Sequence, residues 1–284
     1  MAWRKLGVIA GGGELPIALA EHCKAQGRDY YVARIEHMAD PALEAHPGAT
    51  HNLGAVGGRI AALKEAGVDA IVIIGQVPRP DLSTLKLDDR AQAMLPAVMA
   101  AMTQGDDALL RVLLDEHERE GFRVVGADDV MGDLLAPAGV WGAHAPTAQQ
   151  MKDVAKASNI AAAIGSFDIA QGVVVCAGLV LAVEAAEGTD QMLARVATLP
   201  APIRGSAESR RGVLVKRPKP IQERRIDLPV VGVRTIEGAA AAGLAGVAVE
   251  AHGALALRRA EMIAAADRLG LFIYGFTRAE MGER

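Results

Sequence analysis

The sequence is poor in aromatic residues and in cysteine. Phe, Trp and Tyr make up 3% of the 284 residues, although 51% are hydrophobic, so a core must be built from Ala, Val, Leu and Ile. The two cysteines, Cys23 and Cys176, have neither zinc-ligand nor redox spacing. Both lie in apolar stretches, which is typical of reduced core thiols and favours a cytoplasmic protein over a disulfide scaffold.

A large charge excess and a long apolar run are absent as well. The formal net charge is -4, so composition gives no electrostatic reason to expect a nucleic-acid partner. No apolar run reaches the roughly 18 residues that a transmembrane helix needs. The longest, 172–183, is rich in β-branched residues and indicates two buried strands. The short apolar run near the N-terminus meets Gly11–Gly13, which indicates a strand and a turn rather than a signal peptide.

Strands and helices alternate along the first half of the chain. Strands are predicted at 6–10, 30–35, 70–75 and 122–126, and helices at 14–26, 56–66, 90–102 and 106–120. The segment 70–75 is apolar without alternation, which is typical of a strand buried in a parallel sheet. Because strands alternate with helices, we expect an N-terminal Rossmann-like parallel α/β domain.

Proline and glycine cluster between residues 134 and 146, where we place a domain boundary, since a chain of this length usually forms two domains. We expect an N-terminal domain at 1–134, a linker at 135–146 and a C-terminal mixed α/β domain at 147–284. The strands predicted in the second domain are 171–177, 179–185, 212–216, 245–250 and 271–275. Its predicted helices are one capped by Thr147 that ends near 164, one at 189–197, one capped by Thr235, and one at 257–269.

A glycine turn follows the first strand and opens a helix. Gly11, Gly12 and Gly13 allow backbone amides to approach an anion, and the helix N-terminus adds partial positive charge. Pro16 stands where a dinucleotide-binding fingerprint has its third glycine. A phosphate or nucleotide site and a purely structural turn both stay open here. With Glu36 as a ribose partner, the same turn is the basis of a nicotinamide-dependent alternative.

Acids gather around the segment from Glu184 to Asp190. Glu184, Glu187 and Asp190, with the hydroxyl of Thr189, follow an apolar strand and precede a helix. Hard divalent cations prefer such oxygen ligands, and ligand sites of α/β proteins favour strand ends. A capped helix is the alternative interpretation. Asp106 and Asp107 lie where another helix is predicted to begin, and helix capping or dipole complementation is the favoured interpretation for one of the two.

The segment from Lys216 to Gly232 combines cations, one aspartate and three prolines. Its cations include Lys216, Lys219, Arg224 and Arg225, and Asp227 is its one aspartate. The prolines exclude a helix and predict a stiff, extended chain. Cations that neutralise phosphate oxygens, beside an acid that holds a metal or a water, suit a pyrophosphate site. A solvated basic linker is the alternative. No nucleophile elbow or histidine triad pattern points to covalent catalysis.

These motifs, in their order and spacing, carry a resemblance over nearly the whole chain. They are Leu6–Pro16, Gly105–Arg111, Phe167–Val175, Glu184–Asp190, Lys216–Gly232 and Gly246–Glu250. The chain resembles the LpxI-type UDP-2,3-diacylglucosamine hydrolases of lipid A biosynthesis. Glu223 stands where the family pattern has an aspartate, and Ala170 where it has a glycine. Neither departure removes Asp227, which matches the essential aspartate of the family.

The resemblance implies a two-domain, metal-dependent pyrophosphatase in the cytoplasm. Its substrate is the lipid-linked sugar nucleotide UDP-2,3-diacylglucosamine, which water cleaves to UMP and 2,3-diacylglucosamine 1-phosphate. We predict Mg²⁺ or Mn²⁺ as cofactor and Asp227 as catalytic residue. The predicted metal ligands are Asp227, Glu184, Glu187 and Asp190. The predicted substrate-binding residues are Gly11, Gly12, Gly13, Leu15, Gln171, Thr189, Lys216, Lys219, Gln222 and Arg225.

The sequence also bears on binding partners and on alternative functions. We expect no nucleic acid, and leave open a transient contact with the inner-membrane surface and a homodimer. From the residues alone, two other functions stay open. An NAD(P)-dependent oxidoreductase would bind the nicotinamide cofactor and need no metal. A non-catalytic sugar-nucleotide-binding protein would bind without turnover.

Overall fold

The computed structural model describes residues 3–78 and 81–283, and the chain forms two compact units. The first comprises residues 1–132 and 223–227, and the second comprises residues 133–222 and 228–284. The chain therefore changes unit after Gly132, after Gln222 and after Asp227. The contiguous domains predicted from the sequence, 1–134 and 147–284, do not anticipate the return of Glu223–Asp227 to the first unit.

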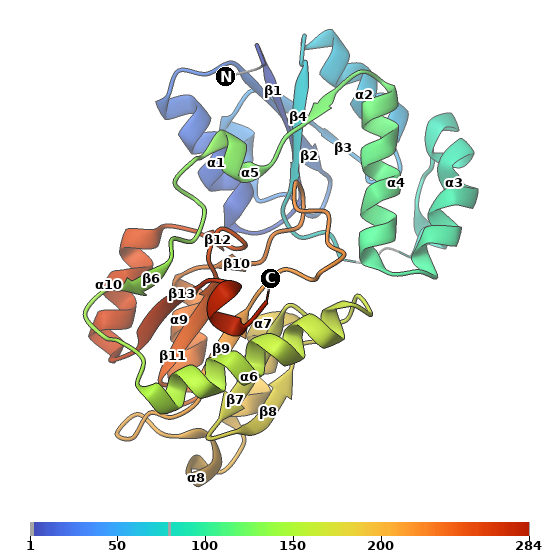
Figure 1. Cartoon of the computed structure of the whole chain (residues 1–284). Helices are drawn as coiled ribbons and strands as arrows, with labels where there is room; N and C mark the ends of the chain where they lie inside the picture. The colour runs from blue at the N-terminus through green and yellow to red at the C-terminus, as the bar shows by residue number, and fades with distance from the viewer. Residues whose placement is uncertain (1–2, 79–80, 284) are drawn as a thin grey trace. The chain divides into compact units, whose positions relative to one another are not determined.

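The first unit is built on a parallel sheet of five strands (Figure 1). Its strands are β1 (Leu6–Ala10), β2 (Tyr30–Ile35), β3 (Gly48–His51), β4 (Ala70–Ile74) and β5 (Arg123–Val124). Its helices are α1 (Glu14–Ala25), α2 (Val56–Glu65), α3 (Asp89–Met102), α4 (Asp106–Arg119) and α5 (Ala127–Val130), with 3₁₀ turns η1 (Pro41–Ala45) and η2 (Leu82–Thr84). The strand order β3-β2-β1-β4-β5 reverses beside β1, which confirms the predicted Rossmann-like α/β class.

The second unit is a mixed six-stranded sheet of order β6-β13-β11-β9-β7-β8. The strands are β6 (Gly139–Trp141), β7 (Gly172–Cys176), β8 (Leu179–Val183), β9 (Val213–Lys216), β11 (Gly246–Glu250) and β13 (Phe272–Phe276); β10 (Val230–Val231) and β12 (Leu255–Ala256) form a separate pair. The central strands β9, β11 and β13 are parallel, whereas β6, β7 and β8 are antiparallel to their neighbours. The mixed α/β class predicted for this half is confirmed.

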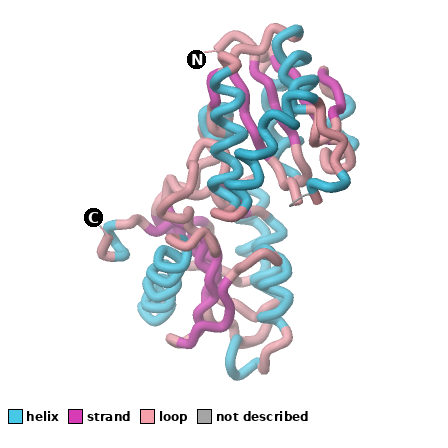
Figure 2. The backbone as a smooth tube through the Cα atoms, turned by 90° about the vertical axis from the view of Figure 1, so that its right-hand side faces the viewer, coloured by secondary structure: helices cyan, strands magenta, loops and turns pink. Residues whose placement is uncertain are grey.

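Helices cover both faces of this sheet, as Figure 2 shows. They are α6 (Ala148–Gly165), α7 (Gly188–Ala197), α9 (Val233–Ala241) and α10 (Arg259–Leu269), and the short helix α8 (Ala201–Arg204) and a 3₁₀ turn η3 (Ala279–Met281) complete the unit. Val213 and Val215 pack with α6, while Leu214 packs on the opposite face with α7, α9 and α10. This alternation places Lys216, the last residue of β9, on the α7 side.

Two local predictions for the second unit were wrong. The predicted linker 135–146 contains β6, which pairs antiparallel with β13 and buries Trp141, although its Pro and Gly content resembles a loop. Thr235 is not the N-cap of its helix, because α9 begins after Gly232. The Thr235 hydroxyl instead accepts a hydrogen bond from the Gly232 amide at 3.4 Å. Within the described residues, none of the helices combines the length and the apolar character needed to cross a bilayer.

Candidate active site

Polar residues of the second unit gather where β9 ends and β7 begins. Lys216 ends β9 and lies opposite Gly172 of β7 and Val249 of β11. Glu184 follows β8, and its amide donates to the Gly172 carbonyl at 2.9 Å. The carboxyl ends of parallel strands are the usual ligand-binding edge of α/β sheets. The sheet register therefore brings two predicted site residues, Glu184 and Lys216, to that edge.

Lys216, Thr189 and Glu184 form a chain of hydrogen bonds. The Lys216 ammonium donates to the Thr189 hydroxyl at 2.7 Å, and that hydroxyl donates to Glu184 Oε1 at 2.6 Å. Lys216 is 6% exposed, and a buried lysine is rare unless it is paired. Among residues 3–78 and 81–283 it makes this single hydrogen bond, so two N–H groups of the ammonium are not used. In the same part of the chain, the buried Glu184 Oε2 atom has no hydrogen-bond partner.

Arg217 points to the opposite face of the sheet, and both of its terminal guanidinium nitrogens are engaged. Its guanidinium pairs with Glu283 and with Glu250 at 3.1 Å, and donates to the Ser158 hydroxyl at 2.9 Å. Burial lowers the pKa of Arg217, but Glu283 and Glu250 outweigh it, so the pKa is raised. These contacts join α6, β11 and the C-terminal segment. Arg217 therefore stabilises the unit, in contrast to Lys216 next to it.

Lys219 and Gln222 lie in a turn after β9. The ammonium of Lys219 forms an ion pair with Asp168, and both side chains are buried. The Gln222 side chain accepts a hydrogen bond from the Lys219 amide at 2.8 Å. Gln171 contributes its carbonyl to the Arg217 amide at 3.0 Å. As predicted, segment 216–232 forms no helix. The chain here is bent by turns, however, whereas the sequence predicted an extended segment.

Glu223–Asp227 packs against helix α4 in the first unit. The Glu223 amide donates to the buried carboxylate of Asp107 at 2.7 Å, and Arg111 pairs with the same carboxylate at 2.7 Å. Arg225 binds Glu223 at 3.0 Å and Glu118 at 2.6 Å. The hydrogen bonds from Arg225 lower the pKa of Glu223. This packing is the physical reason for the return of the chain to the first unit.

Asp227 ends this segment, with its amide donating to the Glu223 carbonyl at 3.2 Å. The sequence favoured helix capping by one of Asp106 and Asp107, yet Gly105 is the N-cap of α4, no side chain caps that end, and Asp107 contacts Glu223. Its contact with Glu223 was missed because the two residues are far apart in sequence. The signal available was two acids in the first turn of α4, where one would complement the helix dipole.

The glycine turn between β1 and α1 is closed by backbone hydrogen bonds. The amides of Gly11 and Gly12 donate to the carbonyls of Ile74 and Gln76 at 2.9 and 2.8 Å. A Cβ on Gly11 would lie 2.6 Å from the Gln76 carbonyl oxygen, so the turn requires glycine for close packing. Gly13 has φ 92° and open space around it, and no side chain caps α1. Of the predicted turn residues, Gly13 and Leu15 remain at a helix start that could receive an anion.

The predicted metal ligands do not form one group within either unit. Glu187 pairs with Arg195 at 2.8 Å, and Asp190 pairs with Arg234 at 2.7 Å. Asp227 belongs to the first unit, and Glu184 to the second. No cluster of three or more His, Cys, Asp or Glu that could hold a metal occurs in the described part of the chain. Mg²⁺ or Mn²⁺ stays a prediction from the sequence.

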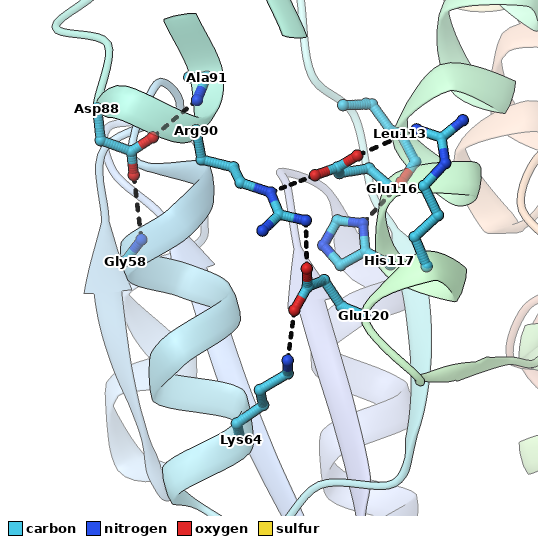
Figure 3. A network of polar contacts seen from close by, with 10 residues as sticks. Gly58, Lys64, Asp88, Arg90, Ala91, Leu113, Glu116, His117 and Glu120 are labelled. Atoms are coloured by element: carbon cyan, nitrogen blue, oxygen red, sulfur yellow. Dashed lines mark hydrogen bonds and ion pairs between the residues drawn. The ribbon is translucent and has the colours of Figure 1, made fainter. Parts of the chain in front are cut away.

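Another polar network joins helices α2, α3 and α4 in the first unit (Figure 3). Arg90 pairs with Glu116 and Glu120, and Lys64 also pairs with Glu120. Asp88 accepts from the amides of Gly58 at 3.0 Å and Ala91 at 2.9 Å, so one carboxylate serves the first turns of α2 and α3. Because the charges in this network are paired with one another, it has the character of a structural brace.

The fold is that of an α/β protein, with Glu184, Thr189 and Lys216 clustered at the edge of the sheet where such proteins usually bind ligands. Models of two domains match the chain: the LpxI N-terminal domain over residues 5–134 and the LpxI C-terminal domain over residues 137–274. The protein belongs to the LpxI family. The chain is also 54% identical over 272 residues to the UDP-2,3-diacylglucosamine pyrophosphatase LpxI of Caulobacter vibrioides, covering 96% of this chain and 97% of that protein.

Solved structures add little to this assignment. CobK precorrin-6A reductase matches with 15% identity and a TM-score of 0.32, over 96% of this chain and 87% of that one. An NAD-dependent epimerase/dehydratase, described as putative, from Methylobacillus flagellatus matches with 14% identity and a TM-score of 0.25, over 49% and 42%. Both scores are too low to carry a functional argument.

Proposed function

We propose that this protein is a hydrolase of lipid A biosynthesis that cleaves the pyrophosphate bond of UDP-2,3-diacylglucosamine. Water attacks a phosphorus atom, a P–O bond of the pyrophosphate breaks, and UMP and 2,3-diacylglucosamine 1-phosphate leave. The observation that carries the proposal is the 54% identity to a UDP-2,3-diacylglucosamine pyrophosphatase over 96% of this chain. The same relationship favours a hydrolase over the nicotinamide-dependent alternative.

Lys216 is the residue that we assign to the pyrophosphate. A buried ammonium attracts a phosphate oxygen more strongly than an exposed one, because less water screens the charges. Lys216 has two N–H groups available for such an oxygen. As the bond breaks, negative charge increases on the departing phosphate oxygen. Lys216 therefore stabilises the transition state more than the ground state, which is what accelerates a reaction.

Thr189 and Glu184 hold Lys216 in place. The Thr189 hydroxyl accepts a hydrogen bond from the ammonium and donates one to Glu184 Oε1. The threonine is then saturated as donor, and the glutamate fixes its orientation. We accordingly assign Glu184 to positioning Lys216 instead of to the predicted metal site. Gln171, Lys219, Gln222, Arg225 and the start of α1 at Gly13 and Leu15 complete the proposed binding residues.

Asp227 is the proposed catalytic residue. Its role is to orient the attacking water or to bind the divalent metal, Mg²⁺ or Mn²⁺, which would neutralise phosphate charge when bound. Glu187 and Asp190 already neutralise arginines, so the metal proposal depends mainly on Asp227. We further propose action in the cytoplasm with transient contact at the inner-membrane surface, where a lipid-linked substrate is available. A homodimer is compatible with these assignments.

The test is UMP release from UDP-2,3-diacylglucosamine, measured with Mg²⁺, with Mn²⁺ and with EDTA. We expect metal-dependent turnover by the unchanged protein and a loss of at least about 100-fold in Asp227→Asn, the range for one key electrostatic group. Asp190→Asn is the matched control. Because Asp190 is half exposed and paired with Arg234, we expect that variant to stay within about twofold.

The outcomes separate the alternatives. Substrate binding without UMP release under any metal would support the non-catalytic sugar-nucleotide-binding protein. Full activity in EDTA would remove the metal from the proposal but keep the hydrolase. Full activity of Asp227→Asn would remove Asp227, and equal losses in both variants would mean that Asp190 is a ligand after all.

A further inference from the structure

The turn after helix α6 exposes apolar side chains and buries an acid. Phe167 is 77% exposed and Ile169 is 52% exposed. Asp168, between them, has a side chain that is 6% exposed and ion-paired with Lys219. Large apolar residues are normally buried and acids exposed, so this turn reverses the usual arrangement. A conspicuous apolar surface in a folded protein commonly marks a binding site.

The turn is held in this conformation by its own contacts. The amides of Phe167 and Asp168 each donate, at 3.0 Å, to the carbonyls of Ile164 and Gly165. Asp168 has a φ of 61°, which is uncommon for a residue other than glycine. A Cβ on Gly165 would lie 3.2 Å from Lys219 Cα, so the turn and the segment 219–222 pack closely. Phe167 and Ile169 are therefore displayed by a braced turn.

The two chain segments that carry the exposed apolar residues also carry candidate binding residues, and they contact each other through the Asp168–Lys219 ion pair. Lys219, which anchors Asp168, is in the same turn as Gln222, and Ile221 between them is 44% exposed. Gln171 follows Ile169 by two positions and meets the chain next to Lys216 through its carbonyl. We name Phe167, Ile169 and Ile221 the apolar rim. It is built on the same two chain segments that carry the proposed phosphate ligands.

We propose that the apolar rim binds an acyl chain of the substrate, with Phe167 and Ile169 as the main contacts. This inference rests on the proposed function and extends it to the lipid part of the substrate. A substrate with acyl chains close to its pyrophosphate needs an apolar surface beside the phosphate ligands. The rim supplies that surface on chain segments adjacent to Lys216 and Gln222.

The experiment compares Phe167→Ser, Ile169→Ser and the double variant in hydrolysis of UDP-2,3-diacylglucosamine with long and with short acyl chains. We expect the double variant to raise KM for the long-chain substrate about tenfold, equivalent to about 1.4 kcal/mol. With short chains the rise should shrink, and kcat at saturation should stay near that of the unchanged protein. Leu179→Ser is the control, since Leu179 is 56% exposed in the same unit but begins β8 at the other end of the hairpin.

Other results would overturn the inference. Unchanged KM in the double variant, with thermal unfolding also unchanged, would remove the rim from substrate binding. An equal rise in KM for substrates with long and with short acyl chains would mean that the variants weaken binding of the head group. Sedimentation with phospholipid vesicles free of substrate tests the other lipid source. If the double variant loses vesicle binding while KM for dispersed substrate is unchanged, the rim is a membrane contact instead. Absence of turnover in the unchanged protein would be a failure of the proposed function itself.

Discussion

Lys64 in the first unit and Lys216 in the second unit each belong to a polar cluster. The two lysines differ in what their charges contact. Lys64 is half exposed and belongs to a network in which Arg90, Glu116 and Glu120 balance one another across α2, α3 and α4 (Figure 3). Lys216 is buried at a strand end, with one hydrogen bond to Thr189. The first cluster is complete, whereas the second retains donor capacity.

This difference separates charges that stabilise the fold from charges that bind a ligand. Burying an ammonium without full compensation costs free energy, and the fold must offset that cost elsewhere. Such a cost persists where the charge has a use, as in many functional sites. Exposed, mutually paired charges cost little and contribute little individually. Burial combined with unused hydrogen-bonding capacity is thus the feature that identifies Lys216.

The largest effect expected from this comparison is on Lys216. Lys216→Met keeps the length and apolar stem of the side chain but removes the charge. We expect kcat/KM for UMP release to fall by about 100-fold or more, as for loss of one donor to a developing negative charge. Lys64→Met, the matched change in the complete cluster, should leave kcat/KM within about twofold. Equal activity of the two variants would remove the distinction between the clusters.

A smaller effect is expected at the two glutamates. Glu184→Gln weakens the hold on Thr189 and Lys216, so we expect kcat/KM to fall about tenfold with little change in stability. Glu116→Gln should lower the free energy of unfolding by about 1–2 kcal/mol, because the buried carboxylate holds Arg90 and Arg119, with activity per folded molecule unchanged. Activity comes from UMP release and stability from urea unfolding.

The threonine provides a check on the role of Glu184. Thr189→Ser keeps the hydroxyl between Lys216 and Glu184, so it should retain most activity, whereas Thr189→Val should lose about as much as Glu184→Gln. If Thr189→Val is fully active, the chain of hydrogen bonds does not position Lys216. A binding change seen as a large rise in KM with normal kcat would place Glu184 in ground-state binding instead.

Local sequence was sufficient for most of the architecture. Periodicity and capping predicted β1, α1, β4 and α6 within one or two residues, since these elements are set by their own apolar patterns and by caps such as Thr147. Prediction from local sequence failed where long-range pairing decides the structure. β6 is a strand because β13 offers it hydrogen bonds, which no property of residues 135–146 reveals.

The site shows the same division. The segments with Glu184, Thr189 and Lys216 could be singled out by residue type, but their convergence depends on the register of β7, β8 and β9. The sequence prediction assigned Glu187 and Asp190 to a metal. It could not foresee that Arg195 pairs with Glu187 and Arg234 with Asp190, because each arginine lies more than one helix turn away in sequence. The attachment of Glu223–Asp227 to α4 through Asp107 is likewise a long-range contact.

The last expected effect is the pH dependence of stability from His117, beside the network of the first unit; unlike the others it is absent at neutral pH. Burial lowers the pKa of His117 below its ordinary 6.5, with Arg59 and Arg90 adding to the shift, while the Leu113 carbonyl and Glu116 oppose it. Near pH 6.5 the unfolded chain therefore binds a proton at His117 that the folded chain does not bind. Stability contributed by neutral His117 is present above pH 6.5 and falls as pH drops below it, by up to about 1.4 kcal/mol per pH unit.

Urea unfolding between pH 7.5 and 5 should show this decline, and His117→Gln should reduce its slope by nearly one proton. His144→Gln, at an exposed histidine of the other unit, is the matched control for replacing an imidazole. A slope that His117→Gln leaves unchanged would mean that His117 protonates as readily in the folded protein as in the unfolded chain.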